Sequence, residues 1–137
     1  MRLVTRQRPF IAAGQKGPLF DINSGALIET TAGAVTYTVQ QLSSVLILRD
    51  PNGAIRSDVT PTAALLIAAD PSVIPGTAFK FTIRNTADAA ETITMTAGTG
   101  VTLSGTMTIA QNNSKEFMIV VTSPTTCTMY SLGTVVH

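Results

Sequence analysis

The stretch GTAFKFTIRNT, residues 76–86, decides the fold class of this chain. Its apolar residues Phe79, Phe81 and Ile83 occupy every second position, and polar residues stand between them. Successive side chains of an extended strand point to opposite faces of a sheet. The pattern therefore predicts a β-strand with one buried face and one solvent-facing face.

The segments that follow repeat this alternation. In ETITMTAGTG, residues 91–100, Ile93 and Met95 are expected to point inward. Further short strands are predicted in VTLSG, TMTIA, KEFMIVVT and CTMYSL. Short strands at intervals of roughly eight to twelve residues are typical of a sandwich or barrel. We therefore predict a mainly β protein, an antiparallel β-sandwich that is jelly-roll-like or another Greek key.

The segments that precede residue 60 also favour strands. ALIET and AVTYTVQ are separated by Thr31-Ala32-Gly33, which predicts a hairpin, and QQLSSVLILRD favours a short turn of helix followed by a strand into Arg49. Asp50-Pro51-Asn52-Gly53 predicts a type I turn followed by a left-handed glycine. Such a hairpin would place Arg49 opposite Ile55.

One short helix is expected near residues 61–70. Thr60 is a good N-cap, Pro61 suits the first helical position, and Pro71 ends the helix because the residue before a proline avoids helical backbone angles. Leu65 and Leu66 are expected to pack onto a sheet.

The composition points to contact between proteins. Charged residues make up 12% of the chain, against about 25% in ordinary soluble domains, and threonine is abundant. A threonine-lined face costs less to bury against a neighbour than a charged face, because no ion is desolvated. A β protein with threonine on its outer face and no partner remains the alternative reading.

The first 25 residues differ from the rest of the chain. Prolines and glycines punctuate them and predict an extended arm, residues 1–25, before a β-sandwich domain, residues 26–137. The formal charge of +1 is the sum of +4 from the first 17 residues and −3 from five basic and eight acidic residues after them. The residues that we expect to bind a partner are Arg2, Arg6, Arg8, Phe10, Ile11 and Lys16.

Three partners could receive a basic arm. Nucleic acid is disfavoured because four charges with one aromatic are a modest footprint. A membrane surface would need an amphipathic helix, which Pro9 and the glycines prevent. A protein partner needs charge and apolar anchors, and the arm has both. We favour the protein partner over a solvated tail.

Residue types for catalysis or metal binding are sparse. Cys127 is the only cysteine and is expected to be a small buried apolar residue. His137 is the only histidine, so neither a histidine metal site nor a Ser/His pair is expected within one chain. Arg49 and Asp58 flank the predicted hairpin and are expected to form an exposed ion pair worth less than about 1 kcal/mol. We expect no enzyme activity, no cofactor and no metal.

The start of the chain lacks a secretory signal pattern, and the longest apolar run, ALLIAA, is too short to cross a bilayer. These observations predict synthesis in the cytoplasm and no membrane partner.

A resemblance adds to this reading. VLILRDPNGAIRSDVTPTAALLIAADPSVIPGTAFKFTIRNT and ETITMTAGTGVTLSGTMTIAQNNSKEFMIVVTS, which cover about two thirds of the chain, resemble a β-sandwich module of tailed-phage virion structural proteins. The shared features include Arg49, the turn at residues 50–53, Asp58 and the turn at residues 98–101. The resemblance implies a structural role in a virion, commonly as a trimer, and brings no catalytic residues.

Two functions follow as expectations. In the first, the protein is a capsid decoration (cement) protein on the particle exterior, a homotrimer that binds the major capsid protein or another virion protein and clamps a neighbouring subunit with its arm. In the second, the domain is the head or adaptor of a tail fibre or spike that binds a host receptor. That role usually needs aromatic or polar loops that bind sugars, and only Tyr37 and Tyr130 are available. Short length and lack of repeats favour the first.

Overall fold

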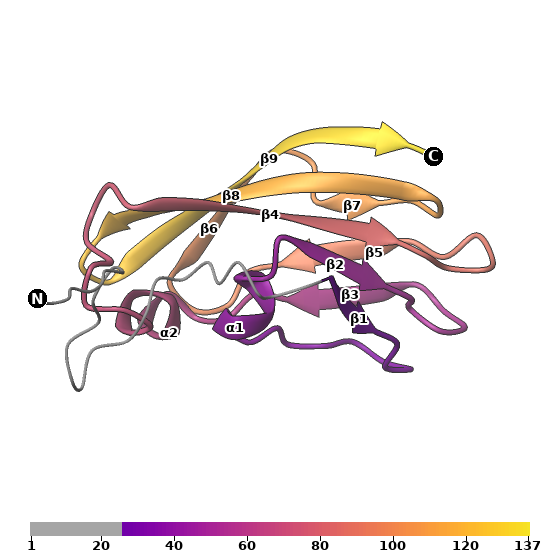
Figure 1. Ribbon diagram of the computed structural model, residues 1–137, viewed down its shortest axis with the longest axis horizontal. Helices are drawn as coiled ribbons and strands as arrows, with labels where there is room; N and C mark the ends of the chain where they lie inside the picture. Colours follow the sequence, from indigo (N-terminus) through magenta and orange to yellow (C-terminus); the bar gives the residue numbers. More distant parts are fainter. Residues whose placement is uncertain (1–25) are drawn as a thin grey trace, which may run out of the picture.

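Two β-sheets make up the computed structural model, which describes residues 26–137 (Figure 1). Sheet A has the strand order β1 (Leu27–Glu29), β2 (Leu46–Arg49), β4 (Ala78–Asn85), β8 (Asn113–Ser123), β9 (Thr126–Val136) and β6 (Val101–Ser104). Sheet B has the order β3 (Arg56–Val59), β5 (Ile93–Thr96) and β7 (Thr108–Ile109). The prediction of a mainly β protein is confirmed.

The strands run in mixed directions. Strand β8 is antiparallel to both β4 and β9, and β5 is antiparallel to β7. The pairs β1–β2, β2–β4, β3–β5 and β6–β9 are parallel. The prediction that the sheets are antiparallel is therefore wrong for these four pairs. From β2 to β8 successive strands alternate between the two sheets, so neighbours within a sheet are not joined by hairpins.

The turn at residues 50–53 illustrates this alternation. It connects β2 in sheet A to β3 in sheet B, so the predicted hairpin with Arg49 opposite Ile55 is wrong. Asn52 and Gly53 both have positive φ angles, 54° and 94°, whereas a type I turn needs a negative φ at the Asn52 position. The Asp50 carboxylate accepts a hydrogen bond from the Asn52 backbone N–H at 2.8 Å, which stabilises the bend.

The predicted hairpin around residues 31–33 is also wrong. Strand β1 pairs in parallel with β2, and Thr36 forms an isolated parallel bridge with Val59 in sheet B. The expected helical turn before β2 is confirmed as α1 (Val39–Leu42). Its capping box joins Thr38 to Gln41, because each side chain accepts a hydrogen bond from the other residue's backbone N–H.

The second helix, α2 (Ala63–Ala68), is shorter than the expected 61–70. Its N-cap is Thr62, whose hydroxyl accepts a hydrogen bond from the Leu65 N–H at 3.2 Å. Thr60 cannot serve as the cap because its hydroxyl accepts from the Gly98 N–H at 2.9 Å and donates to the Pro61 carbonyl. Leu66 is buried, whereas Leu65 is 58% exposed, so only one of the two leucines packs as expected.

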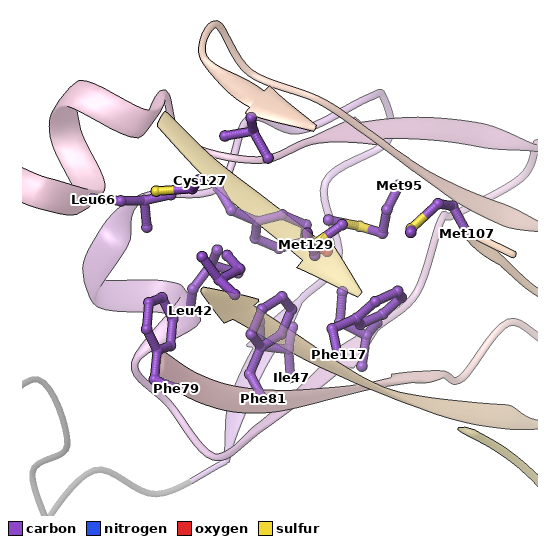
Figure 2. Close-up of a cluster of buried hydrophobic side chains, with 14 of the residues drawn as sticks. Leu42, Ile47, Leu66, Phe79, Phe81, Met95, Met107, Phe117, Cys127 and Met129 are labelled. Carbon is purple, nitrogen blue, oxygen red and sulfur yellow. The ribbon is translucent and has the colours of Figure 1, made fainter. Parts of the chain in front are cut away.

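A single hydrophobic core contains residues from both sheets (Figure 2). Phe79, Phe81 and Ile83 of β4 are buried as the alternation predicts, and so is Cys127. Phe81 and Phe117 stack with their ring centroids 5.5 Å apart. Figure 2 also shows Met95, Met107 and Met129 among the core side chains. Burial of apolar side chains from both sheets is the main force that holds the sheets together.

Candidate functional site

The six residues predicted to bind a partner lie outside the described residues. They are Arg2, Arg6, Arg8, Phe10, Ile11 and Lys16. Their role stays a prediction.

A buried ion pair connects the two sheets at the turn between β2 and β3. The Nε atom of Arg49 lies 2.8 Å from an Asp58 carboxylate oxygen, and both side chains are fully buried. A second contact, from the guanidinium of Arg49 to the other carboxylate oxygen, measures 3.2 Å. The prediction of an exposed ion pair is wrong, because both side chains are fully buried. Their strands, β2 and β3, lie in different sheets rather than in one exposed hairpin.

Arg49 also binds three backbone carbonyls. Its guanidinium donates to the carbonyls of Thr31 at 2.9 Å, Gly33 at 2.6 Å and Asp50 at 2.7 Å. Together with the contacts to Asp58, these bonds use all five N–H groups of the guanidinium. Arg49 therefore fixes the loop before α1 and the turn after β2 in one geometry.

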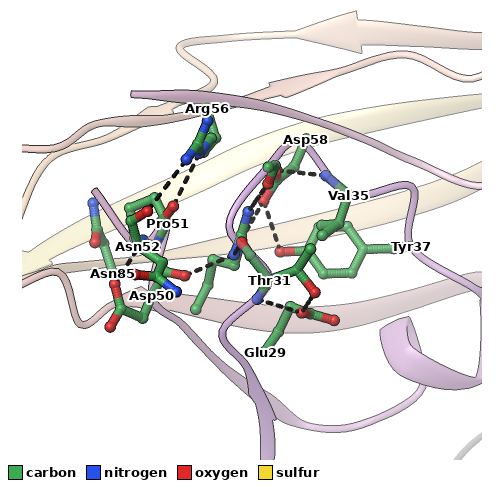
Figure 3. Close-up of polar contacts among 12 residues, drawn as sticks. Glu29, Thr31, Val35, Tyr37, Asp50, Pro51, Asn52, Arg56, Asp58 and Asn85 are labelled. Carbon is green, nitrogen blue, oxygen red and sulfur yellow. Dashed lines mark hydrogen bonds and ion pairs between the residues drawn. The ribbon is translucent and has the colours of Figure 1, made fainter. Parts of the chain in front are cut away.

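Asp58 has two further donors (Figure 3). The Val35 N–H donates to it at 3.0 Å and the Tyr37 hydroxyl at 3.1 Å. Burial, followed by the charge of Asp58, raises the pKa of Tyr37 far above its ordinary value. Burial alone would lower the pKa of Arg49, but the hydrogen bond and charge of Asp58 raise it. Both shifts favour the protonated forms of the Tyr37 hydroxyl and the Arg49 guanidinium, which are the forms that donate to Asp58.

A second buried polar group lies at the end of β4. The Asn85 side-chain amide donates to the carbonyls of Glu91 at 2.7 Å and Ile109 at 3.0 Å, and its oxygen accepts from the Ala87 N–H at 3.0 Å. These bonds attach the end of sheet A to the loop before β5 and to β7. Within the described part, the Oε2 atom of Glu91 is buried without a hydrogen-bond partner.

A Ser/His pair does form, contrary to the sequence-based expectation. The Ser114 hydroxyl and the His137 Nε2 atom lie 2.7 Å apart at the exposed end of β8. Among residues 26–137, no acidic side chain hydrogen-bonds to the other ring nitrogen of His137. Sequence reasoning missed the pair because it treated the last residue as isolated, whereas the β8–β9 register places His137 opposite Asn112, from where its ring reaches Ser114 diagonally.

In the described part of the chain, no three side chains of the metal-ligating types His, Cys, Asp and Glu gather at one point. Nor does any described helix have the length and apolar character to cross a membrane.

A shallow groove lies on the side of sheet A that faces away from the core. Its volume is about 560 Å³, and it is lined by Val45, Ala78, Phe79, Lys80, Met118 and Leu132. Val45 and Leu132 are 64% and 45% exposed. The nearby Lys80–Glu116 pair, 3.5 Å apart, is exposed as well. The groove was not predicted, because the alternating pattern identifies a solvent-facing side without showing which residues of different strands gather there.

Comparison of the chain with family models, with curated proteins and with solved structures found no match. The resemblance to tailed-phage virion proteins therefore stays a prediction.

Proposed function

We propose that this protein is a non-enzymatic structural component of a virion, a capsid decoration protein that oligomerises and stabilises the shell. The observation that carries the proposal is the apolar, weakly charged outer face of sheet A. Exposed apolar groups that gather on one face commonly mark a protein–protein contact surface.

The outer face offers contact area at low desolvation cost. Val45, Tyr130 and Leu132 are all more than a third exposed. Among the outward-facing residues of β4, Lys80 is paired with Glu116, Thr82 carries no charge, and Arg84 adds one further charge near the end of the strand. Covering this face would bury apolar carbon and threonine methyl groups while removing few ions from water.

The buried polar residues support a structural role in a different way. The contacts of Arg49, Asp58 and Tyr37 are made to each other and to the backbone of the loops. Tyr37 is only 1% exposed, so it cannot serve as a platform for a receptor sugar, and Tyr130 is 38% exposed. This burial favours the decoration protein over the receptor-binding fibre head.

The finer features of the proposal rest on the sequence. The two sheets around one core are arranged as a β-sandwich of jelly-roll or other Greek-key type. Residues 1–25 are the arm that clamps a neighbouring subunit or the major capsid protein, through their four basic residues and the anchors Phe10 and Ile11. A homotrimer on the outside of the particle is the expected assembly.

Deletion of residues 1–16 tests this role. The truncated protein is expected to fold, with an unfolding transition close to that of the full chain, because residues 37–129 of the described part already form a hydrophobic core that draws on both sheets. It should no longer bind particles that lack the wild-type protein. A full-length variant with Arg2, Arg6 and Arg8 changed to lysine keeps the charge and is expected to bind. Undiminished binding by the truncated protein would contradict the proposal.

A further inference from the structure

Within residues 26–137, the last part of β9 has an edge that no strand covers. On one side, β9 pairs with β8 along its length. On the other side, β6 covers only Cys127–Tyr130. Figure 1 shows β9 running on beyond β6 toward the C-terminal end, with β8 beside it. Among the described residues, no strand pairs with the outer edge of residues 132–136.

The hydrogen-bond register shows which backbone groups are free. The His137 N–H donates to the Asn112 carbonyl at 2.9 Å, and Val136 lies opposite Asn113. Along an antiparallel strand, the backbone N–H and C=O groups of one residue point to one neighbouring strand, and those of the next residue point to the opposite side. The N–H and C=O groups of Thr134 and Val136 therefore face away from β8. Another extended backbone offers donors and acceptors at a matching spacing.

This edge differs from the other edges of the described sheets. Edge strands β1, β7 and β6 have only three, two and four residues, and edge strand β3 carries the charged residue Arg56. Short length and charge are devices that protect an edge from pairing. Strand β9, in contrast, contains no charged residue, and Val135 and Val136 are 58% and 76% exposed.

We propose that this edge pairs with the same segment of a second copy of the chain. The two segments run antiparallel about a two-fold axis, with Val135 opposite its own copy and Thr134 opposite Val136. Each outward N–H of Thr134 and Val136 then meets a carbonyl of the second copy, and the exposed Val135 side chains cover each other.

Self-pairing suits this strand for two reasons. A strand without charge suffers no like-charge repulsion when it lies against itself, and it offers no ion pair that would favour a charged strand of another protein. A two-fold contact also closes on itself, which leaves no further free edge at this point. The proposed contact involves only the segment at residues 132–136 of each copy and does not depend on the virion role.

Disulfide trapping tests the register. In the proposed pair, the two Val135 residues form a non-hydrogen-bonded pair with their Cα atoms about 4.5 Å apart, which is within the range of Cα separations of disulfide bonds. Val135→Cys is expected to give a covalent dimer under mild oxidation. Ile28→Cys is the matched control, because residue 28 is also exposed but lies on β1 at the far edge of sheet A. Background from Cys127 is small, since that thiol is buried.

Charge insertion tests the contact without a covalent bond. Val135→Lys places two ammonium groups opposite each other, so the mass of the assembly in solution should fall by half, while Ile28→Lys should leave it unchanged. Thermal unfolding checks that both variants are folded. Equal cross-linking of the two cysteine variants, or an unchanged mass for Val135→Lys, would overturn the inference. So would a disulfide that joins residue 135 to a different protein.

Discussion

The carboxylate of Asp58 in sheet B and the guanidinium of Arg49 in sheet A meet at 2.8 Å, with both side chains fully buried. This contact joins two strands that follow each other in sequence and belong to different sheets. The carbonyls of Thr31 and Gly33 bind the same guanidinium, so the loop before α1 is fixed at this point as well. The pair thus determines how the chain passes from one sheet to the other.

Arg49→Met is expected to destabilise the protein by about 3–5 kcal/mol, because the substitution leaves the Asp58 charge buried without a partner. Chemical denaturation measures the change in the free energy of unfolding. Arg84→Met is the matched control on the neighbouring strand β4, since residue 84 lies on the outward-facing side of sheet A. Equal stabilities of the two variants would show that the buried pair does not hold the sheets.

Gly98→Ala is expected to destabilise the fold by about 1–3 kcal/mol through overpacking. A Cβ atom at residue 98 would lie 2.5 Å from the Thr60 carbonyl oxygen and 2.7 Å from that of Pro61, and backbone atoms cannot easily move aside. Gly33→Ala is the control, because no atom of the described residues, apart from the two chain neighbours, lies within 4 Å of a Cβ at that position. Thermal unfolding of both variants checks the prediction, which fails if residue 98 tolerates alanine as well as residue 33 does.

Glu29 is expected to make the stability depend on acidity. The hydrogen bond from the Thr31 hydroxyl, at 2.5 Å, is the largest cause that lowers the pKa of Glu29, and burial opposes it. A lowered folded-state pKa stabilises the protein above the unfolded-state pKa of about 4.3, and this contribution is lost as the pH falls through the folded-state value.

Glu29→Gln should remove that part of the pH dependence. Unfolding free energies measured from pH 6 down to strongly acidic conditions, about pH 2–3, test this prediction. The difference between the wild-type protein and the variant should be largest at pH 6 and shrink on acidification. A difference that stays constant over this range would show that the Thr31 contact does not favour the ionised carboxylate.

The sequence predicted those strands whose apolar residues alternate clearly. Phe79, Phe81 and Ile83 are buried as expected, because a strand at the edge of a core must separate apolar from polar side chains. The same pattern contains no information about which sheet a strand joins. Strands β2 and β3 were therefore assigned to one hairpin, although they lie in different sheets.

The environment of Arg49 could not be predicted for a related reason. An arginine beside a turn is usually exposed, and its burial here depends on carbonyls of Thr31 and Gly33, which are distant in sequence. The groove on sheet A likewise combines residues of the three neighbouring strands β4, β8 and β9 with Val45, which directly precedes β2, and their proximity follows from the strand order.

The copy number of this chain in purified virus particles tests the proposed function most directly. Quantitative mass spectrometry against the major capsid protein would measure it. A decoration protein that covers the shell is expected in roughly hundreds of copies per particle, because a closed symmetric assembly repeats the same binding site at every equivalent position of the capsid. About a dozen copies would instead indicate a tail or vertex component, and absence of the chain from particles would contradict a structural role in the virion.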